Sequence, residues 1–307
     1  MKTLSEKSRQ PLLDETTNFA RFMGRYYLHD FQEGISACGQ EYWLMTLADA
    51  SGELKVYCHN PVLMEKKPIV GMWVHIEASL SQPKGMAYFC CKNLLLEAPV
   101  ERIGADLSSL PRSACPIDYA FDALFFIVSR ISNQILRDFL RDVLLQPDVA
   151  INYLRCPASV NYHHNYEGGL LVHSLEMAWQ IICAEELSAD EQNIAVVAAL
   201  LHDIGKVWTL KPQLRRTPMG SLVGHDYLTL EVCAKPLKKL SESAPGFANQ
   251  LRHAWTCHSP KARYGFKPRT RVAKYLQRVD HNSAFVGYPE TFLPRFSQTS
   301  EALVGNL

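Results

Sequence analysis

A His-Asp dipeptide is the centre of the residues that could do chemistry in this sequence. His202 and Asp203 follow an apolar stretch with a helical pattern, and Gly205 and Lys206 come directly after them. A neutral imidazole beside a carboxylate offers mixed nitrogen and oxygen ligands for a divalent ion such as Mn²⁺, Fe²⁺ or Mg²⁺. Lys206 adds a positive charge that can stabilise charge developing on a phosphate oxygen. The dipeptide predicts a metal site, although an ordinary capped helix end has the same residues.

Histidine is concentrated in the second half of the chain. Of the 11 histidines, eight fall between His163 and His281. His173 follows a Gly-Gly pair early in a predicted helix, beside the apolar stripe of that helix. His173, His202, Asp203 and Asp280 would make a set of two histidines and two aspartates for one ion, and His225 with His258 could hold a second.

Three further histidines have less certain roles. His163 and His164 can orient metal ligands, contact a substrate phosphate or lie in an exposed loop. His253 precedes His258 by five residues, which is about 140° around a helix, so the two cannot face one ion on the same helix. We expect a structural role for His253.

The order of these residues resembles the HD superfamily of metal-dependent phosphohydrolases, which carries His, His-Asp and Asp on consecutive helices. The chain is most similar to the YhaM-type 3′→5′ exoribonucleases, which join an N-terminal OB-fold to an HD domain. One departure is Ser259, where that family tends to have a second histidine after His258. The resembling motifs are Gly34-Ile35, 42–49, 52–57, His163-His164, Gly169-Leu170 with His173, 201–206, 220–225, 251–253, His258 and Val279-Asp280.

The resemblance implies a metal-dependent hydrolase with one or two divalent ions. Mn²⁺ is the expected ion, with Fe, Mg, Co or Ni as alternatives. Asp203 would bridge ions or accept a proton from water, and Lys206 would stabilise the phosphorane. The expected metal ligands are His173, His202, Asp203, His225, His258 and Asp280.

Two blocks of sequence must position these residues in a multi-domain α+β chain. Residues 16–100 alternate short aromatic and β-branched runs with turn signals, which predicts a five-stranded OB-like β-barrel that binds nucleic acid; an SH3-like barrel is the alternative. The expected strands are 24–30, 42–47, 53–58, 72–78 and 86–94. Outward aromatics among Tyr42, Trp43, Tyr57, Tyr88 and Phe89 can stack on bases, while the others form core.

The second block is helical. The apolar period changes to 3.6 after a proline-containing linker at 101–116, which predicts an all-α HD domain over 117–307. We expect residues 1–15 to be a flexible N-terminus. The expected helices are 117–131, 133–145, 169–187, 191–204, 227–240, 248–256 and 270–284.

The charge distribution points to a polyanion. The formal net charge of the 307 residues is only +1. Residues 206–281 nevertheless hold 15 Lys and Arg against 4 Asp and Glu, a net of +11, while the remainder holds 17 against 27, a net of −10. A solvated helix face usually mixes signs, so the one-sign stretch Lys261–Arg278 favours a nucleic-acid track. The expected substrate contacts are His163, His164, Lys261, Arg263, Lys267, Arg269 and Arg271.

The overall composition excludes several protein classes. Apolar residues make up 47% and charged residues 21%, which excludes disordered, collagen-like and coiled-coil chains. There is no signal-like N-terminus and no apolar run long enough to span a membrane. The nine cysteines show no C-x-x-C pair, so we expect free thiols in a cytoplasmic protein. A homo-oligomer is compatible with the sequence.

Three functions compete on these observations. The first is a 3′→5′ exonuclease that acts on single-stranded RNA, and that could also accept single-stranded DNA. The second is an HD-type small-nucleotide phosphohydrolase, for which the barrel and the basic stretch would be superfluous. The third is a non-catalytic protein that binds single-stranded nucleic acid. The barrel and the basic stretch favour the first.

Overall fold

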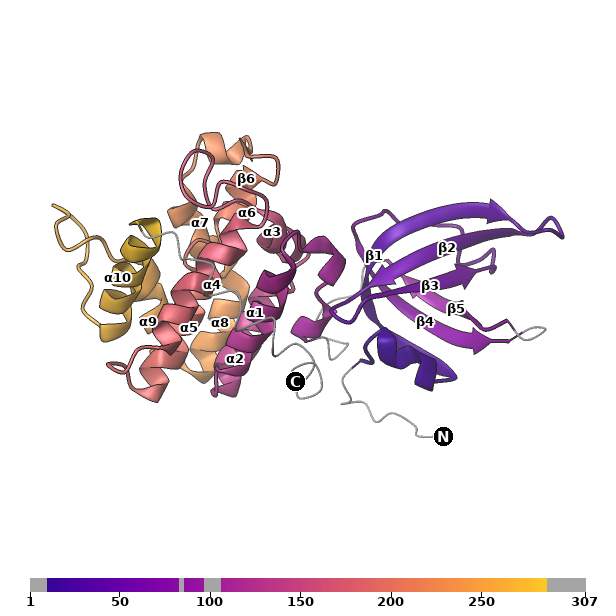
Figure 1. Ribbon diagram of the computed structural model, residues 1–307, viewed down its shortest axis with the longest axis horizontal. Coiled ribbons are helices and arrows are strands. Elements are labelled where there is room, and N and C mark those ends of the chain that lie inside the picture. Colours follow the sequence, from indigo (N-terminus) through magenta and orange to yellow (C-terminus); the bar gives the residue numbers. More distant parts are fainter. Residues whose placement is uncertain (1–9, 83–85, 97–105, 286–307) are drawn as a thin grey trace. The chain divides into compact units, whose positions relative to one another are not determined.

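The computed structural model describes residues 10–82, 86–96 and 106–285 (Figure 1). The chain divides into two compact units, Met1–Ala114 and Cys115–Leu307. The first contains the strands of the barrel, and the second contains the helices that carry the candidate site. Each unit is considered by itself below.

The first unit is a closed five-stranded barrel, as predicted. The strand order is β1-β2-β3-β5-β4, and β1 pairs with both β2 and β4 to close it. Only β3 and β5 run parallel, which is the Greek-key arrangement of an OB-fold. β1 is longer than the expected 24–30 because its two halves pair with different neighbours. The strands are β1 (Arg21–Ile35), β2 (Glu41–Ala48), β3 (Glu53–Cys58), β4 (Trp73–Ser81) and β5 (Tyr88–Leu95).

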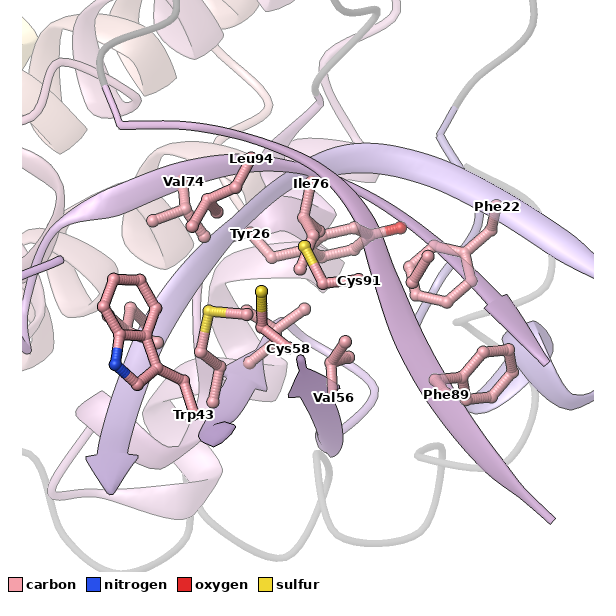
Figure 2. Packing of buried hydrophobic residues seen from close by; sticks show 14 of the residues in the cluster. Phe22, Tyr26, Trp43, Val56, Cys58, Val74, Ile76, Phe89, Cys91 and Leu94 are labelled. Carbon is pink, nitrogen blue, oxygen red and sulfur yellow. The ribbon is translucent and has the colours of Figure 1, made fainter. Parts of the chain in front are cut away.

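Side chains alternate between the barrel interior and its surface, as the period of two requires. The inward-pointing ones pack together as the core of the barrel (Figure 2). Trp43 and Phe89 are buried in the core together with Phe22, whose ring meets that of Phe89 edge-on. Their sequence neighbours Tyr42 and Tyr88 are only half-buried. The alternation therefore separates core aromatics from those that a ligand could reach.

The segment before β1 is ordered against the barrel. The side chain of Gln10 is buried and exchanges two hydrogen bonds with the backbone of Arg25, each 3.0 Å long. Leu12 and Leu13 are also buried, and a 3₁₀ turn, η1, covers Asp14–Asn18. The prediction of a flexible stretch over 1–15 is therefore wrong for residues 10–15, because their apolar side chains cover the barrel. Residues 1–9 lie outside the described residues.

The predicted linker, 101–116, is described only from residue 106. Two 3₁₀ turns, η4 (Leu107–Ser109) and η5 (Arg112–Ala114), hydrogen-bond to the barrel through the backbones of Ala50 and Asp49. They belong to the first unit, whose boundary with the second falls after Ala114. Residues 97–105 lie outside the described residues.

Over residues 115–285, the part of the second unit that the structure describes, the regular elements are helices and one short hairpin. Helices α4 and α5 are buried around most of their circumference, which places them at the centre of the unit. A capping box between Ser188 and Glu191 starts α5. The helices are α1 (Asp118–Ser129), α2 (Gln134–Leu144), α3 (Ala150–Arg155), α4 (Gly169–Ile182), α5 (Ala189–Leu201), α6 (Lys206–Thr209), α7 (His225–Val232), α8 (Ala234–Ser243), α9 (Pro245–Thr256) and α10 (Arg271–Phe285).

Three local features differ from the expected helices. The expected helix over 227–240 is divided at Cys233 into α7 and α8. The short helices α3 and α6 were not predicted, because each is too short to show a periodic stripe. A hairpin of β6 (Leu210–Lys211) and β7 (Arg215–Arg216) precedes a 3₁₀ turn, η6 (Met219–Ser221).

All nine cysteines lie among the described residues, and none of them forms a disulfide there. Within the described ranges, none of the helices has the length and apolar character that a membrane crossing requires.

Candidate metal centre

Helices α4, α5, α7 and α10, with the turn after α5, bring five of the six predicted ligands together. His173 lies in the second turn of α4, and Asp280 lies on α10, which packs against both α4 and α5. His202 caps the C-terminus of α5, and Asp203 follows it in the turn before α6. His225 is the first residue of α7. The order His, His-Asp, His and Asp along the chain thus becomes one cluster in space.

The first group of donors is compact. His173 Nε2 lies 3.2 Å from His202 Nε2 and 3.4 Å from Asp280 Oδ1. His202 Nε2 lies 3.8 Å from Asp280 Oδ1 and 3.3 Å from Asp203 Oδ2. Ligand atoms about 2.1 Å from one ion are separated by roughly 3.0–3.4 Å in octahedral or tetrahedral geometry. The observed separations therefore suit His173, His202 and Asp280 as ligands of a single divalent ion, and Asp203 lies beside them next to His202.

The facing nitrogens also indicate that a cation or a proton is shared between them. The Nδ1 atom of His202 lies 2.8 Å from the carbonyl oxygen of Ala199, which can only accept, so Nδ1 carries the proton. In the neutral ring, Nε2 then presents a lone pair toward the cluster. The Nδ1 atom of His173 is likewise engaged, 3.1 Å from Ser283 Oγ, and its Nε2 faces that of His202. Two such nitrogens at contact distance repel unless a cation or proton lies between them.

The electrostatics of the cluster favour positive charge. Burial lowers the pKa of His202, but the adjacent Asp203 carboxylate outweighs burial and raises that pKa to about 9. Burial raises the pKa of Asp203, yet His202 and Lys206 hold it well below its usual range. The pKa of Asp280 is also lowered, since the hydrogen bond with His173 and the charge of His202 outweigh burial. Two anionic carboxylates thus surround the imidazoles and attract a cation.

A second group of donors consists of Asp203, His225 and Asp226, and Asp203 also adjoins the first group through His202. The Oδ1 atom of Asp203 lies 3.1 Å from His225 Nε2, which lies 3.2 Å from Asp226 Oδ1. The other oxygen of Asp203 faces His202. One carboxylate can therefore bridge two neighbouring ions. Asp226 was missed at the sequence level, although its position directly after His225 was a signal.

Lys206 is held against the shared carboxylate. Its ammonium group donates to Asp203 Oδ2, and its side chain is only 13% exposed. The lysine and the aspartate come from one turn, three residues apart. This places a fixed positive charge at the edge of the cluster, the position that the predicted role at phosphate requires.

The remaining predicted histidines are not among these two groups. His258 is exposed and belongs to the loop after α9, where its backbone N–H donates to Phe266. Among the described residues, the compact donor groups do not include it. His163 is exposed. The side chain of His164 is largely covered instead, with Nε2 3.2 Å from Glu176 Oε2.

The basic stretch forms the loop before α10 and the exposed face of that helix. Lys261, Arg263 and Arg269 are exposed, and the guanidinium groups of the two arginines lie over the rings of Tyr264 and Phe266. Two other predicted substrate contacts instead have partners within the protein. Lys267 donates to backbone carbonyls of its own loop, and Arg271 pairs with Glu191 at 3.4 Å. His253 Nε2 accepts from the backbone of Arg269, which supports a structural role for this histidine.

The barrel carries an aromatic groove on its surface, with a volume of about 670 Å³. The ring of Tyr57 is central: its centroid lies 5.7 Å from Tyr42, 5.4 Å from Tyr88 and 6.1 Å from His59, and it is parallel to His59 within 3°. Lys55 also lines the groove. Half-buried rings beside a cation are the features that stack bases and hold phosphates in single-strand binding proteins.

Gly205 allows α7 to approach the His-Asp turn. A Cβ at Gly205 would lie 2.1 Å from the carbonyl oxygen of His225, which no backbone tolerates. We expect Gly205→Ala to displace α7 and to lower the free energy of unfolding by about 1–3 kcal/mol. Thermal denaturation followed by circular dichroism measures this. A Cβ at Gly246 meets nothing within 4 Å, so Gly246→Ala is the matched control. Equal melting temperatures for the two variants would contradict the close approach.

The chain is similar to a known domain family and to several known proteins. Residues 170–284 match the HD domain family. Proteins named 3′-5′ exoribonuclease YhaM from Listeria welshimeri and Halalkalibacterium halodurans are 22% and 23% identical, over 85% and 86% of this chain and 84% and 83% of their own lengths. The protein of that name from Bacillus subtilis is 20% identical over 86% of this chain and 84% of its own. Among solved structures, the mitochondrial single-stranded DNA binding protein Rim1 from S. cerevisiae is similar over 26% of this chain and 94% of its own, with 17% identity and a TM-score of 0.22.

Proposed function

We propose that this chain, an HD-domain protein whose helical unit follows an OB-type barrel, is a metal-dependent 3′→5′ exonuclease that acts on single-stranded RNA. The observation that carries the proposal is the pair of facing imidazole nitrogens of His173 and His202, flanked by the carboxylates of Asp203 and Asp280. The similarity to proteins named 3′-5′ exoribonuclease YhaM supports the direction and the substrate.

The residues of the site fit divalent ions, and Mn²⁺ suits the mixed imidazole and carboxylate donors. Such ions supply Lewis-acid chemistry, polarising a phosphate and lowering the pKa of water. His173, His202, Asp203 and Asp280 would hold one ion, and Asp203, His225 and Asp226 the other. The low pKa of Asp203 favours a ligand role over that of a proton acceptor, because so weak a base draws a proton poorly.

Three groups of this chain would hold the substrate. Lys206 would contact the reacting phosphate, since its ammonium group is fixed at the edge of the cluster. The exposed arginines Arg263 and Arg269 would neutralise neighbouring phosphates, with Tyr264 and Phe266 available to stack on bases. The groove around Tyr57 on the barrel would bind further nucleotides of the same kind of strand.

A small-nucleotide phosphohydrolase is the alternative that shares the same metal centre. The aromatic groove and the basic loop favour the exonuclease, because a mononucleotide could not occupy several stacking rings and several arginines together. The alternative requires hydrolysis of mononucleotides that is unaffected by loss of the barrel. A purely binding protein would need no bridged pair of donor groups around Asp203.

The proposal is tested with purified full-length protein, Mn²⁺ and 5′-labelled single-stranded RNA, with the products resolved on a denaturing gel. We expect a ladder of shortening labelled products, abolished by EDTA, because a 3′→5′ enzyme leaves the 5′ label on the remaining strand. Single-stranded DNA of the same sequence, run in parallel, measures the preference for ribose. Release of labelled mononucleotide at the first time point would show the opposite direction. Intact RNA alongside hydrolysed mononucleotides would support the alternative.

A further inference from the structure

A buried hydrogen-bond relay lies behind His173, on the side of its ring away from the candidate metal centre. The Nδ1 atom of His173 lies 3.1 Å from Ser283 Oγ, and the hydroxyl of Ser283 donates to Glu176 Oε2 at 3.0 Å. Glu176 is 7% exposed and Ser283 is 1% exposed, so water does not compete for these bonds. Burying a carboxylate costs free energy, and the hydrogen bonds to Glu176 must offset that cost.

The direction of each proton in the relay follows from the chemistry of its members. A carboxylate only accepts hydrogen bonds, so Ser283 gives its single proton to Glu176. The oxygen of Ser283 is then left to accept, which requires a proton on Nδ1 of His173. A neutral imidazole protonated at Nδ1 has its lone pair on Nε2. That is the nitrogen that faces His202 and Asp280.

His164 is a second partner of the Glu176 carboxylate and contacts the same oxygen as Ser283. His164 Nε2 lies 3.2 Å from Glu176 Oε2, and both side chains are 8% exposed. The backbone of His164 is left-handed, with φ 52°, and its carbonyl lies where a Cβ of Gly169 would be. His164, His173 and Glu176 are close enough to hold an ion themselves. The hydroxyl of Ser283 already bonds both His173 and Glu176, so hydrogen bonds account for the arrangement.

We propose that Glu176, acting through Ser283, is a positioning residue that holds His173 in the tautomer needed to bind a metal ion. In many proteins, a carboxylate that hydrogen-bonds to the outer nitrogen of a metal-binding histidine fixes its tautomer in this way. The relay also connects two helices of the site, because Ser283 lies one turn beyond Asp280 on α10 and Glu176 lies on α4. The inference rests on the metal centre of the proposed function, and not on the substrate.

Replacing Glu176 with alanine would change which ring nitrogen of His173 carries the proton. The hydroxyl of Ser283 would lose its acceptor and become free to donate to Nδ1 of His173, which moves the imidazole proton to Nε2. We expect the Kd of the metal-free full-length protein for Mn²⁺ to rise by about 10–100-fold, measured by isothermal titration calorimetry. Glu176→Gln keeps an oxygen that can accept from Ser283, so its affinity is expected to stay close to that of the wild type.

A double-mutant cycle separates this role from a purely structural one. Ser283→Ala removes the misdirected donor, so Glu176→Ala with Ser283→Ala is expected to bind Mn²⁺ no more weakly than Ser283→Ala alone. Losses that add in the double variant would overturn the proposal, because they would show that Glu176 does not act through Ser283. Glu185→Ala, an exposed glutamate in the turn after α4, is the matched control and keeps the wild-type affinity.

The tautomer itself gives a second readout. Two-bond ¹H–¹⁵N correlation spectra of the metal-free protein distinguish a proton on Nδ1 from one on Nε2. We expect His173 to carry it on Nδ1 in the wild type and on Nε2 in Glu176→Ala. An unchanged tautomer, or an unchanged Kd in the alanine variant, would overturn the inference. A protein that shows the expected metal affinities but leaves RNA intact would instead contradict the proposed exonuclease.

Discussion

Changing His202 and Asp203 together to alanine is expected to lower the rate of RNA hydrolysis by about 10⁴-fold. When several residues act as one catalytic unit, replacing all of them lowers the rate about as much as replacing the most important one alone. The double change removes an imidazole from the first donor group and the Asp203 carboxylate, which contacts both His202 and His225. Single-turnover cleavage of 5′-labelled RNA with excess Mn²⁺ measures the rate. Isothermal titration with Mn²⁺ measures the accompanying loss of binding.

The barrel supplies a matched control for this change. His29 and Asp30 form another His-Asp dipeptide, on β1 and outside the donor groups, and His29 pairs with Glu53 at 3.3 Å. Changing this dipeptide to two alanines makes the same chemical substitution outside the donor groups. We expect its cleavage rate and metal affinity to match the wild type. Equal losses in the two double variants, or full activity without His202 and Asp203, would contradict the assignment of the metal centre.

Removing the ring of Tyr57 is expected to weaken the binding of single-stranded RNA by about 5- to 150-fold. This range corresponds to roughly 1–3 kcal/mol for each base that stacks on an aromatic side chain. Tyr57 has the largest expected effect because its ring contacts Tyr42, His59 and Tyr88, which together form the groove. Fluorescence anisotropy with labelled RNA measures the Kd, in the His202 and Asp203 double-alanine background so that no substrate is degraded.

Tyr57→Phe separates stacking from hydrogen bonding, since it keeps the ring and removes only the hydroxyl. The Kd of the Tyr57→Phe variant for RNA is expected to stay close to that of the protein that keeps Tyr57. Two results would exclude the groove as a binding surface for bases: an unchanged Kd in Tyr57→Ala, or the same loss in the phenylalanine variant. The melting temperature of each variant shows whether the barrel is intact.

The sequence predicted the elements whose patterns are local. Strand geometry required Tyr42 and Trp43, and likewise Tyr88 and Phe89, to lie on opposite faces of the barrel, and the structure shows that Trp43 and Phe89 are the buried members. His202 and Asp203 were identified because a polar pair that ends an apolar helix stands out by itself. The N-terminal residues 10–15 were misjudged, since their packing depends on the buried amide of Gln10 against the backbone of Arg25.

The parts of the site that the sequence did not reveal depend on long-range contacts. Glu176 and Ser283 are 107 residues apart, and each looks like an ordinary helical residue until α4 and α10 pack together. His258 was chosen for its type and order, but the loop around Gly265 holds it at the surface. Asp226 becomes a candidate ligand only when Gly205 lets α7 approach Asp203. Composition and periodicity contain none of this information.

An anomalous difference map from crystals of the full-length protein grown with Mn²⁺ tests the central claim most directly. We expect a peak among His173 Nε2, His202 Nε2 and the carboxylates of Asp203 and Asp280, and a second, when two ions bind, among Asp203, His225 and Asp226. Because the anomalous signal identifies the ion, the map reports both the position and the ligands of the metal. A map with no peak in this cluster, or with the ion held by other residues, would contradict the account.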